Sequence, residues 1–139
     1  MSAESSSSLS ERLKFLGMNA ETLDSLRANK SVVEKDLPGA LAEFYKLISS
    51  WPTLRAFFSD QGHMGKAKDM QIRHWNNIIK GNFGDEYERS IMAIGHTHSR
   101  IGLEPRWYIG GYAHLTSMLA GAVVKDALKG PFLTETKKN

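Results

Sequence analysis

The placement of helix-starting and helix-ending residues constrains the fold of this 139-residue chain more than any other feature. Gly and Pro recur at the ends of apolar segments with helical spacing, and no stretch of four or more residues keeps the alternation of a strand. The sequence therefore predicts an all-α chain with short connections. Helices are expected over about residues 37–50, 52–58, 62–80, 85–101 and from 105 to the break at 130–131.

Two start signals precede the helix expected over residues 37–50. "SVVE", from Ser31, has the Ser-x-x-Glu spacing of a capping box, and Asp36 with Pro38 forms a second start signal. The second signal places the start of this helix at about Leu37. Ser59 or Asp60 is expected to cap the helix over residues 62–80.

Composition excludes several classes of protein. With no cysteine, the chain forms no disulfide, zinc–thiolate site, iron–sulfur cluster or thioether-linked haem. The net charge of +3 comes from 18 basic and 15 acidic residues without a basic stripe, so we expect no nucleic-acid binding. No apolar run approaches ~18 residues and no signal peptide is visible, which favours a cytoplasmic protein. The Ser-rich residues 1–8 are expected to be disordered and residues 9–139 to form a single domain.

The segment "HTH" places two histidines at different angles on the helix expected over residues 85–101. His98 is seven residues past Ile91 and lies on the apolar stripe, whereas His96 lies roughly 140° away from Ile91. A strand would have let both bind one zinc ion, and a helix does not. His96 is therefore expected on the surface. From spacing alone, His98 is either a hydrogen-bonded core residue or a ligand.

Tyr45 is a second polar residue on an apolar helical face, beside Phe44 and in register with Leu41. A buried phenol usually finds a hydrogen-bond partner. Tyr45 is therefore either an ordinary core tyrosine bonded to a backbone carbonyl or a functional donor. His63 and His74, on the flanks of the next helix, are candidate ligands by residue type but are expected at the rim or surface.

The chain lacks the sequence motifs of common catalytic sites. It has no nucleophile elbow, phosphate loop, dinucleotide fingerprint or His-Glu-x-x-His, and no carboxylate pair that requires an acid–base role. An inward histidine, an inward tyrosine and a wide apolar interior remain. One imidazole suits haem iron, which needs a single axial protein ligand for gas binding. A hydroxyl on the other side would then hydrogen-bond a diatomic ligand.

These residues lie in segments that resemble the sensor globins, the haem domains of globin-coupled sensors. "HSRIGLEPRWYIGGY", from His98, resembles their helix F to helix G segment, "LAEFYKLI" resembles helix B, and "WPTLRAFF" resembles the segment that follows. The match covers roughly residues 37–131. It implies a globin-like helical sandwich that lacks most of the final helix, because the chain ends eight residues after Pro131.

The resemblance implies roles for seven residues around haem b. His98 would be the proximal iron ligand, and the Tyr45 hydroxyl would donate a hydrogen bond to bound O2. Tyr108 would relay the state of the haem to a partner. The cofactor-lining residues implied beside these are Phe57, Phe58, Ala67 and Met70.

The implied function is reversible binding of O2, with CO and NO as the other candidate gases, in the sensory input of a bacterial signal-transduction protein. A kinase, cyclase or chemoreceptor output module would lie outside this chain, which is then not itself an enzyme, and a homodimer is compatible with the resemblance. The alternatives are a stand-alone globin that performs NO/O2 chemistry or scavenging, and a haem-free helical interaction module.

Overall fold

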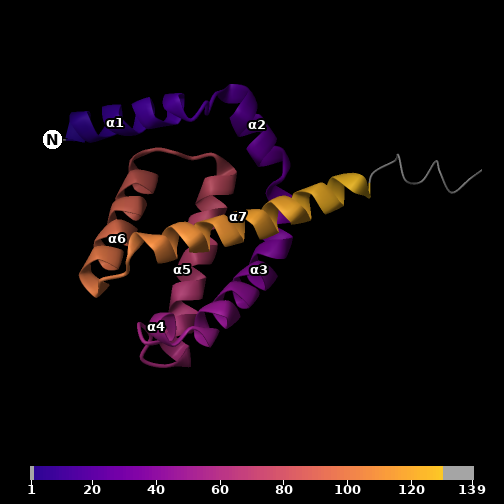
Figure 1. Ribbon diagram of the computed structural model, residues 1–139. Helices are drawn as coiled ribbons and strands as arrows, with labels where there is room; N and C mark the ends of the chain where they lie inside the picture. The colour runs from indigo at the N-terminus through magenta and orange to yellow at the C-terminus, as the bar shows by residue number, and fades with distance from the viewer. Residues whose placement is uncertain (1, 130–139) are drawn as a thin grey trace, which may run out of the picture. The chain divides into compact units, whose positions relative to one another are not determined.

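The computed structural model describes residues 2–129, and for residues 2–7 it describes the backbone alone. The described chain is helical throughout, without a strand (Figure 1), which confirms the predicted all-α class. None of these helices combines the length and apolar character needed to cross a membrane. The predicted break at Gly130-Pro131 lies outside the described residues. The seven helices are α1 (Ser2–Phe15), α2 (Ala20–Ala28), α3 (Lys30–Ser50), α4 (Pro52–Arg55), α5 (Gln61–Lys80), α6 (Asp85–Ile101) and α7 (Pro105–Leu128).

The helices group into two compact units, each assembled from two separate stretches of sequence. Over the described residues, unit 1 comprises 2–30 and 73–104, and unit 2 comprises 31–72 and 105–129. Helix α5 is continuous across residues 72 and 73, so its first part belongs to unit 2 and its last part to unit 1.

Helix α3 supplies most of the buried residues of unit 2. It runs without interruption from Lys30 to Ser50 with Pro38 inside it, so the start predicted at about Leu37 is wrong. The apolar stripe explains the continuity, because Val33, Leu37 and Leu41 follow one another at four-residue spacing on one buried face. Burial on both sides of the exposed Pro38 offsets the hydrogen bond that its missing amide proton removes.

Helix α7 completes the core of unit 2 with Leu115 and Leu119, which are both buried. Its approach to α3 depends on Gly111, where an added Cβ would lie 3.2 Å from two ring carbons of Phe44. With a side chain at this position the Phe44 ring would have to shift by a few tenths of an ångström, so glycine favours the close approach. Of the two glycines in "IGGY", Gly111 is therefore the one that packs against α3.

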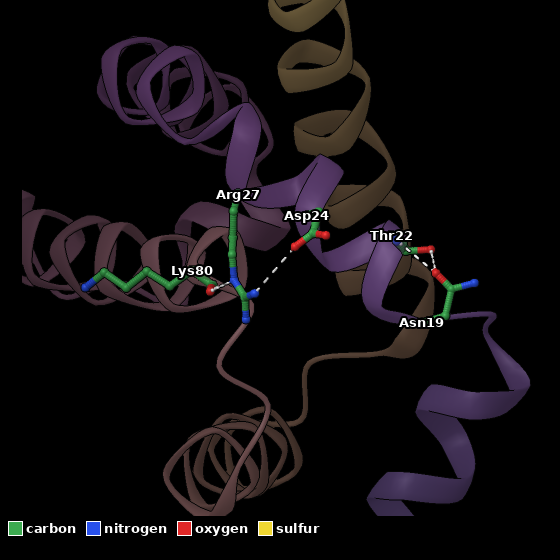
Figure 2. A network of polar contacts seen from close by, with 5 residues as sticks. All are labelled: Asn19, Thr22, Asp24, Arg27 and Lys80. Atoms are coloured by element: carbon green, nitrogen blue, oxygen red, sulfur yellow. Dashed lines mark hydrogen bonds and ion pairs between the residues drawn. The ribbon is translucent and has the colours of Figure 1, made fainter.

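Unit 1 contains a polar network that joins α2 to the end of α5 (Figure 2). Asn19 caps α2, because its Oδ1 accepts a hydrogen bond of 2.9 Å from the backbone N of Thr22. The Nε atom of Arg27 donates to the carbonyl oxygen of Lys80 at 2.9 Å, which satisfies one of the carbonyls left open at the end of α5. The exposed pair between Arg27 and Asp24, 3.9 Å apart, adds little.

The first helix, α1, begins at Ser2, within the Ser-rich residues 1–8 whose expected disorder stays a prediction. No Gly or Pro interrupts Ser2–Phe15, and helix-favouring Leu, Glu, Arg and Lys follow the serines. Helix α1 also contacts α6 within unit 1 and buries Leu9.

Candidate functional site

Tyr45 lies on α3 with 7% of its surface exposed, and aromatic rings surround it. The ring of Phe44 is 5.2 Å from the Tyr45 ring and that of Phe58 is 6.1 Å away, both measured between centroids and both edge-on. Such contacts hold a phenol ring firmly in an apolar environment. Two polar side chains act on its hydroxyl: Tyr112 of α7, which raises the pKa of Tyr45 slightly, and a polar group of α5 that forms a hydrogen bond with it.

That polar group is Gln71 on α5, whose Nε2 donates a hydrogen bond of 3.0 Å to the Tyr45 hydroxyl oxygen. Burial raises the pKa of Tyr45, and the hydrogen bond from Gln71 lowers it by less. Because the side-chain amide is the donor in this bond, the phenol keeps its own proton and can donate it to another group. Helical spacing puts Gln71 on one face of α5 with Met64 and Ala67, and a polar residue among apolar ones was the signal that could have singled it out.

The other predicted cofactor-lining residues from α4 and α5 differ from one another in burial and in their distance from Tyr45. Phe58 contacts Tyr45, and Phe57 is also partly buried after α4. Ala67, partly buried, lies one turn before Gln71 and so shares its face of α5. Met70 is 62% exposed and about 100° around the helix from Gln71. The side chain that reaches Tyr45 from this part of α5 is therefore Gln71, next to Met70.

His98 and His96 differ in exposure as the helical spacing predicts. His98 on α6 is partly buried together with Ile91 and Ile94, whereas His96 is exposed. Burial lowers the pKa of the His98 imidazole. At neutral pH this favours the uncharged ring, which is the form that binds metals.

The end of α6 holds the backbone of His98 in place. Gly102 adopts a left-handed conformation with φ of +73°, and the backbone N of Leu103 donates to the carbonyl oxygen of His98 at 2.9 Å. This arrangement is a glycine C-cap, which stops a helix at a defined residue. The predicted stop at Gly102 therefore also fixes the turn of helix that carries His98.

His74 is a buried residue that the sequence placed at the rim or surface, and that prediction is wrong. It is 7% exposed, and its ring stacks on Tyr87 at 6.0 Å and 10°, with Phe83 edge-on to Tyr87. Burial lowers the pKa of His74 and raises the pKa of Tyr87. His63, by contrast, is exposed as predicted, and its Nδ1 accepts from the backbone N of Ser59 at 3.1 Å.

The first turn of α7 carries the Trp-Tyr pair of the resemblance. Trp107 and Tyr108 are both partly buried. The Trp107 ring lies 5.8 Å from that of Trp51, and the Arg106 guanidinium carbon is 5.7 Å from the Trp107 ring centroid. Helix α7 therefore begins in an aromatic cluster that anchors the segment just before Tyr108.

The donor set fits haem better than a free metal ion. Within residues 2–129, no group of three or more His, Asp or Glu side chains is placed to hold an ion. Haem iron needs one axial protein ligand, and a partly buried histidine with a lowered pKa, such as His98, is a side chain of the kind that suits this role. The chain has no cysteine for a covalent attachment, so a non-covalent haem is the form that these residues fit.

A family model described as Protoglobin matches residues 5–138. The chain belongs to the Protoglobin family. This Protoglobin chain is also 25% identical over 118 residues to the heme-based aerotactic transducer HemAT of Halobacterium salinarum. The match covers 84% of the chain and 24% of that transducer, so the chain spans about a quarter of the relative's length. The resemblance to sensor globins and the globin-like fold are confirmed.

Proposed function

We propose that this Protoglobin chain binds haem b through His98 and reversibly binds a diatomic gas, O2 first among the candidates, as the input of a signalling protein. The observation that carries the proposal is the occurrence, in a globin-family chain, of a partly buried neutral imidazole on α6 and a buried phenol on α3. Bound haem would supply an iron centre with one position open to the gas.

His98 is the proposed axial ligand. Its lowered pKa reduces competition from protons for the ring nitrogen, because metal binding requires the deprotonated ring nitrogen. The C-cap at Gly102 fixes the last turn of α6 and thereby limits how far the imidazole moves. Positional control of this kind maintains a ligand bond of defined length and orientation.

Tyr45 is the proposed hydrogen-bond donor to the gas. Burial keeps its hydroxyl protonated across the physiological pH range, and the rings of Phe44 and Phe58 restrict its motion. Phe57, Phe58 and Ala67 are proposed neighbours of the haem, whereas the exposure of Met70 does not support a place beside it. A polar ligand such as O2 gains more from such a donor than CO does.

The signalling role is proposed from the relative, whose name describes an aerotactic transducer. In our proposal a ligand-dependent shift of His98 acts on the turn from Gly102 to Pro105 and so on Tyr108, a few residues into α7. A kinase, cyclase or chemoreceptor module would receive the signal in a longer protein, and a second copy of the chain is a further candidate partner. CO and NO remain alternative gases.

Substitution of Tyr45 by Phe tests the gas-binding role. After reconstitution with one equivalent of haem, we expect Tyr45→Phe to raise the O2 dissociation rate roughly 10-fold or more, the effect of losing about 1.4 kcal/mol of hydrogen bonding. Stopped-flow displacement measures the rate, and CO dissociation from the same variant is the internal control, because it should change far less. Failure of the chain to take up haem, or an O2 dissociation rate equal to that of the wild type, contradicts the proposal.

A further inference from the structure

We propose that Gln71 is a positioning residue that directs the proton of the Tyr45 hydroxyl toward the bound gas. This inference rests on the proposed function and adds a specificity-determining residue to it. The evidence is the hydrogen bond of 3.0 Å in which Gln71 Nε2 is the donor and the Tyr45 oxygen is the acceptor.

The direction of that bond decides what the phenol does next. A phenol donates one hydrogen and accepts through its oxygen lone pairs, and conjugation with the ring favours two in-plane positions for that hydrogen. An amide N–H aimed at the oxygen disfavours the position that would point the hydrogen back at Gln71. The remaining position directs the hydrogen away from α5, where it serves an outside acceptor such as bound O2.

The aromatic surroundings make this control effective. Tyr45 is 7% exposed, the neighbouring Phe44 and Phe58 rings carry no strong hydrogen-bond acceptor, and Tyr112 is the other polar side chain that acts on its hydroxyl. A phenol that accepts a hydrogen bond also becomes a stronger donor, because chained hydrogen bonds polarise one another. Gln71 is therefore expected to affect both the direction and the strength of the hydrogen bond that Tyr45 gives.

Two substitutions at Gln71 separate a positioning role from a packing role. Gln71→Leu keeps the approximate volume and removes the donor. Gln71→Glu keeps the shape and, when ionised, presents oxygens that accept, so the carboxylate attracts the Tyr45 proton to itself. A packing role predicts that Gln71→Glu resembles the wild type more than Gln71→Leu does, whereas a positioning role predicts the reverse.

The kinetic test uses the haem-loaded chain. We expect Gln71→Leu to raise the O2 dissociation rate roughly 2- to 10-fold, the factor that a net hydrogen-bond contribution gives. Gln71→Glu should raise it further, toward the rate of Tyr45→Phe. In a Tyr45→Phe background neither change should add to the effect. The matched control is Gln61→Leu, which alters an exposed glutamine at the start of the same helix and should leave the rate unchanged.

A second readout does not depend on gas binding. Tyrosine labelled with ¹³C at Cζ reports the hydrogen bonds of each phenol by NMR, and Tyr45→Phe assigns the Tyr45 signal. In the chain without haem, Gln71→Leu should shift this signal and leave those of the other three tyrosines in place. A chain that shows this shift but takes up no haem would overturn the proposed function while leaving the Gln71–Tyr45 bond established.

Two results would overturn the positioning role itself. One is an O2 dissociation rate in Gln71→Leu and Gln71→Glu equal to that of the wild type in a chain that binds haem. The other is an unchanged Tyr45 NMR signal in Gln71→Leu.

Discussion

His74 is the most buried of the described histidines, and its burial has a cost that depends on pH. Desolvation lowers the pKa of His74 in the folded chain below the value of 6.5 that applies when the chain is unfolded. The unfolded chain therefore binds more protons between the two pKa values. Stability contributed by the neutral ring is complete above pH 6.5 and declines as the pH falls through that window.

We expect replacement of His74 by Gln to flatten this acid-side dependence. Urea unfolding at a series of pH values between 5 and 7 should show a smaller slope in His74→Gln than in the wild type, by at most ~1.4 kcal/mol per pH unit for one proton. His114→Gln is the control, because His114 is exposed and its loss should leave the slope unchanged. Equal slopes for wild type and His74→Gln would show that burial of His74 does not control this dependence.

Helix α6 illustrates how an element positions a functional side chain through its end. The helix carries His98 in its last turn, and the left-handed Gly102 and the bond from Leu103 to the His98 carbonyl define where that turn stops. Around Gly102 no atom lies within 4 Å of an added Cβ, so a side chain there would be opposed by backbone conformation and not by crowding. A substitution at Gly102 therefore measures the cost of the left-handed backbone conformation without a contribution from crowding.

Replacement of Gly102 by Ala is expected to destabilise the chain by about 1–2 kcal/mol, the cost of a left-handed conformation for an L-residue. Gly95→Ala should instead stabilise the chain by about 0.5–1 kcal/mol, because Gly95 lies inside α6 and has open space where the Cβ would go. Chemical denaturation measures both. A loss in Gly95→Ala equal to that in Gly102→Ala would contradict the capping role.

At the scale of the whole molecule, the two units are interleaved along the sequence. Each is built from two separate stretches, and α5 is one continuous helix that contributes to both. Neither unit is therefore complete until residues from both halves of the chain have folded. We propose on this basis that the chain unfolds as a single cooperative domain.

A core substitution in unit 2 is expected to shift the unfolding of unit 1 by the same amount. Leu41 is fully buried, and Leu41→Ala should cost about 2–5 kcal/mol. In a Trp51→Phe, Trp107→Phe background, Trp75 of unit 1 is the remaining tryptophan and reports locally. The urea transition of Trp75 fluorescence should coincide with the loss of helicity. Leu41→Ala should shift both transitions to lower urea by the same amount. A Trp75 transition that stays in place would show independent units.

The helices were largely predictable because their ends carry local signals. Asp60, Gly102 and Pro105 stand where the sequence expected helices to start or stop. The errors arose where tertiary burial outweighs a local signal. The stripe through Val33 and Leu37 carries α3 across Pro38.

The candidate site was predictable to a similar extent. Spacing gave the inward Tyr45 and His98, whereas the bond to Gln71 depends on how α5 packs against α3. The burial of His74 likewise depends on the contact of its ring with Tyr87 on another helix, α6. No single-helix pattern contains that information.

The most direct test of the account is the absorption spectrum of the ferrous, haem-reconstituted chain in matched His98→Ala and His96→Ala variants. The two histidines are two residues apart on α6, and they differ in exposure. We predict that His96→Ala keeps the Soret band and visible bands of the wild type, whereas His98→Ala loses the spectrum of a histidine-ligated haem and regains it when imidazole is added. A wild-type spectrum in His98→Ala would contradict the account.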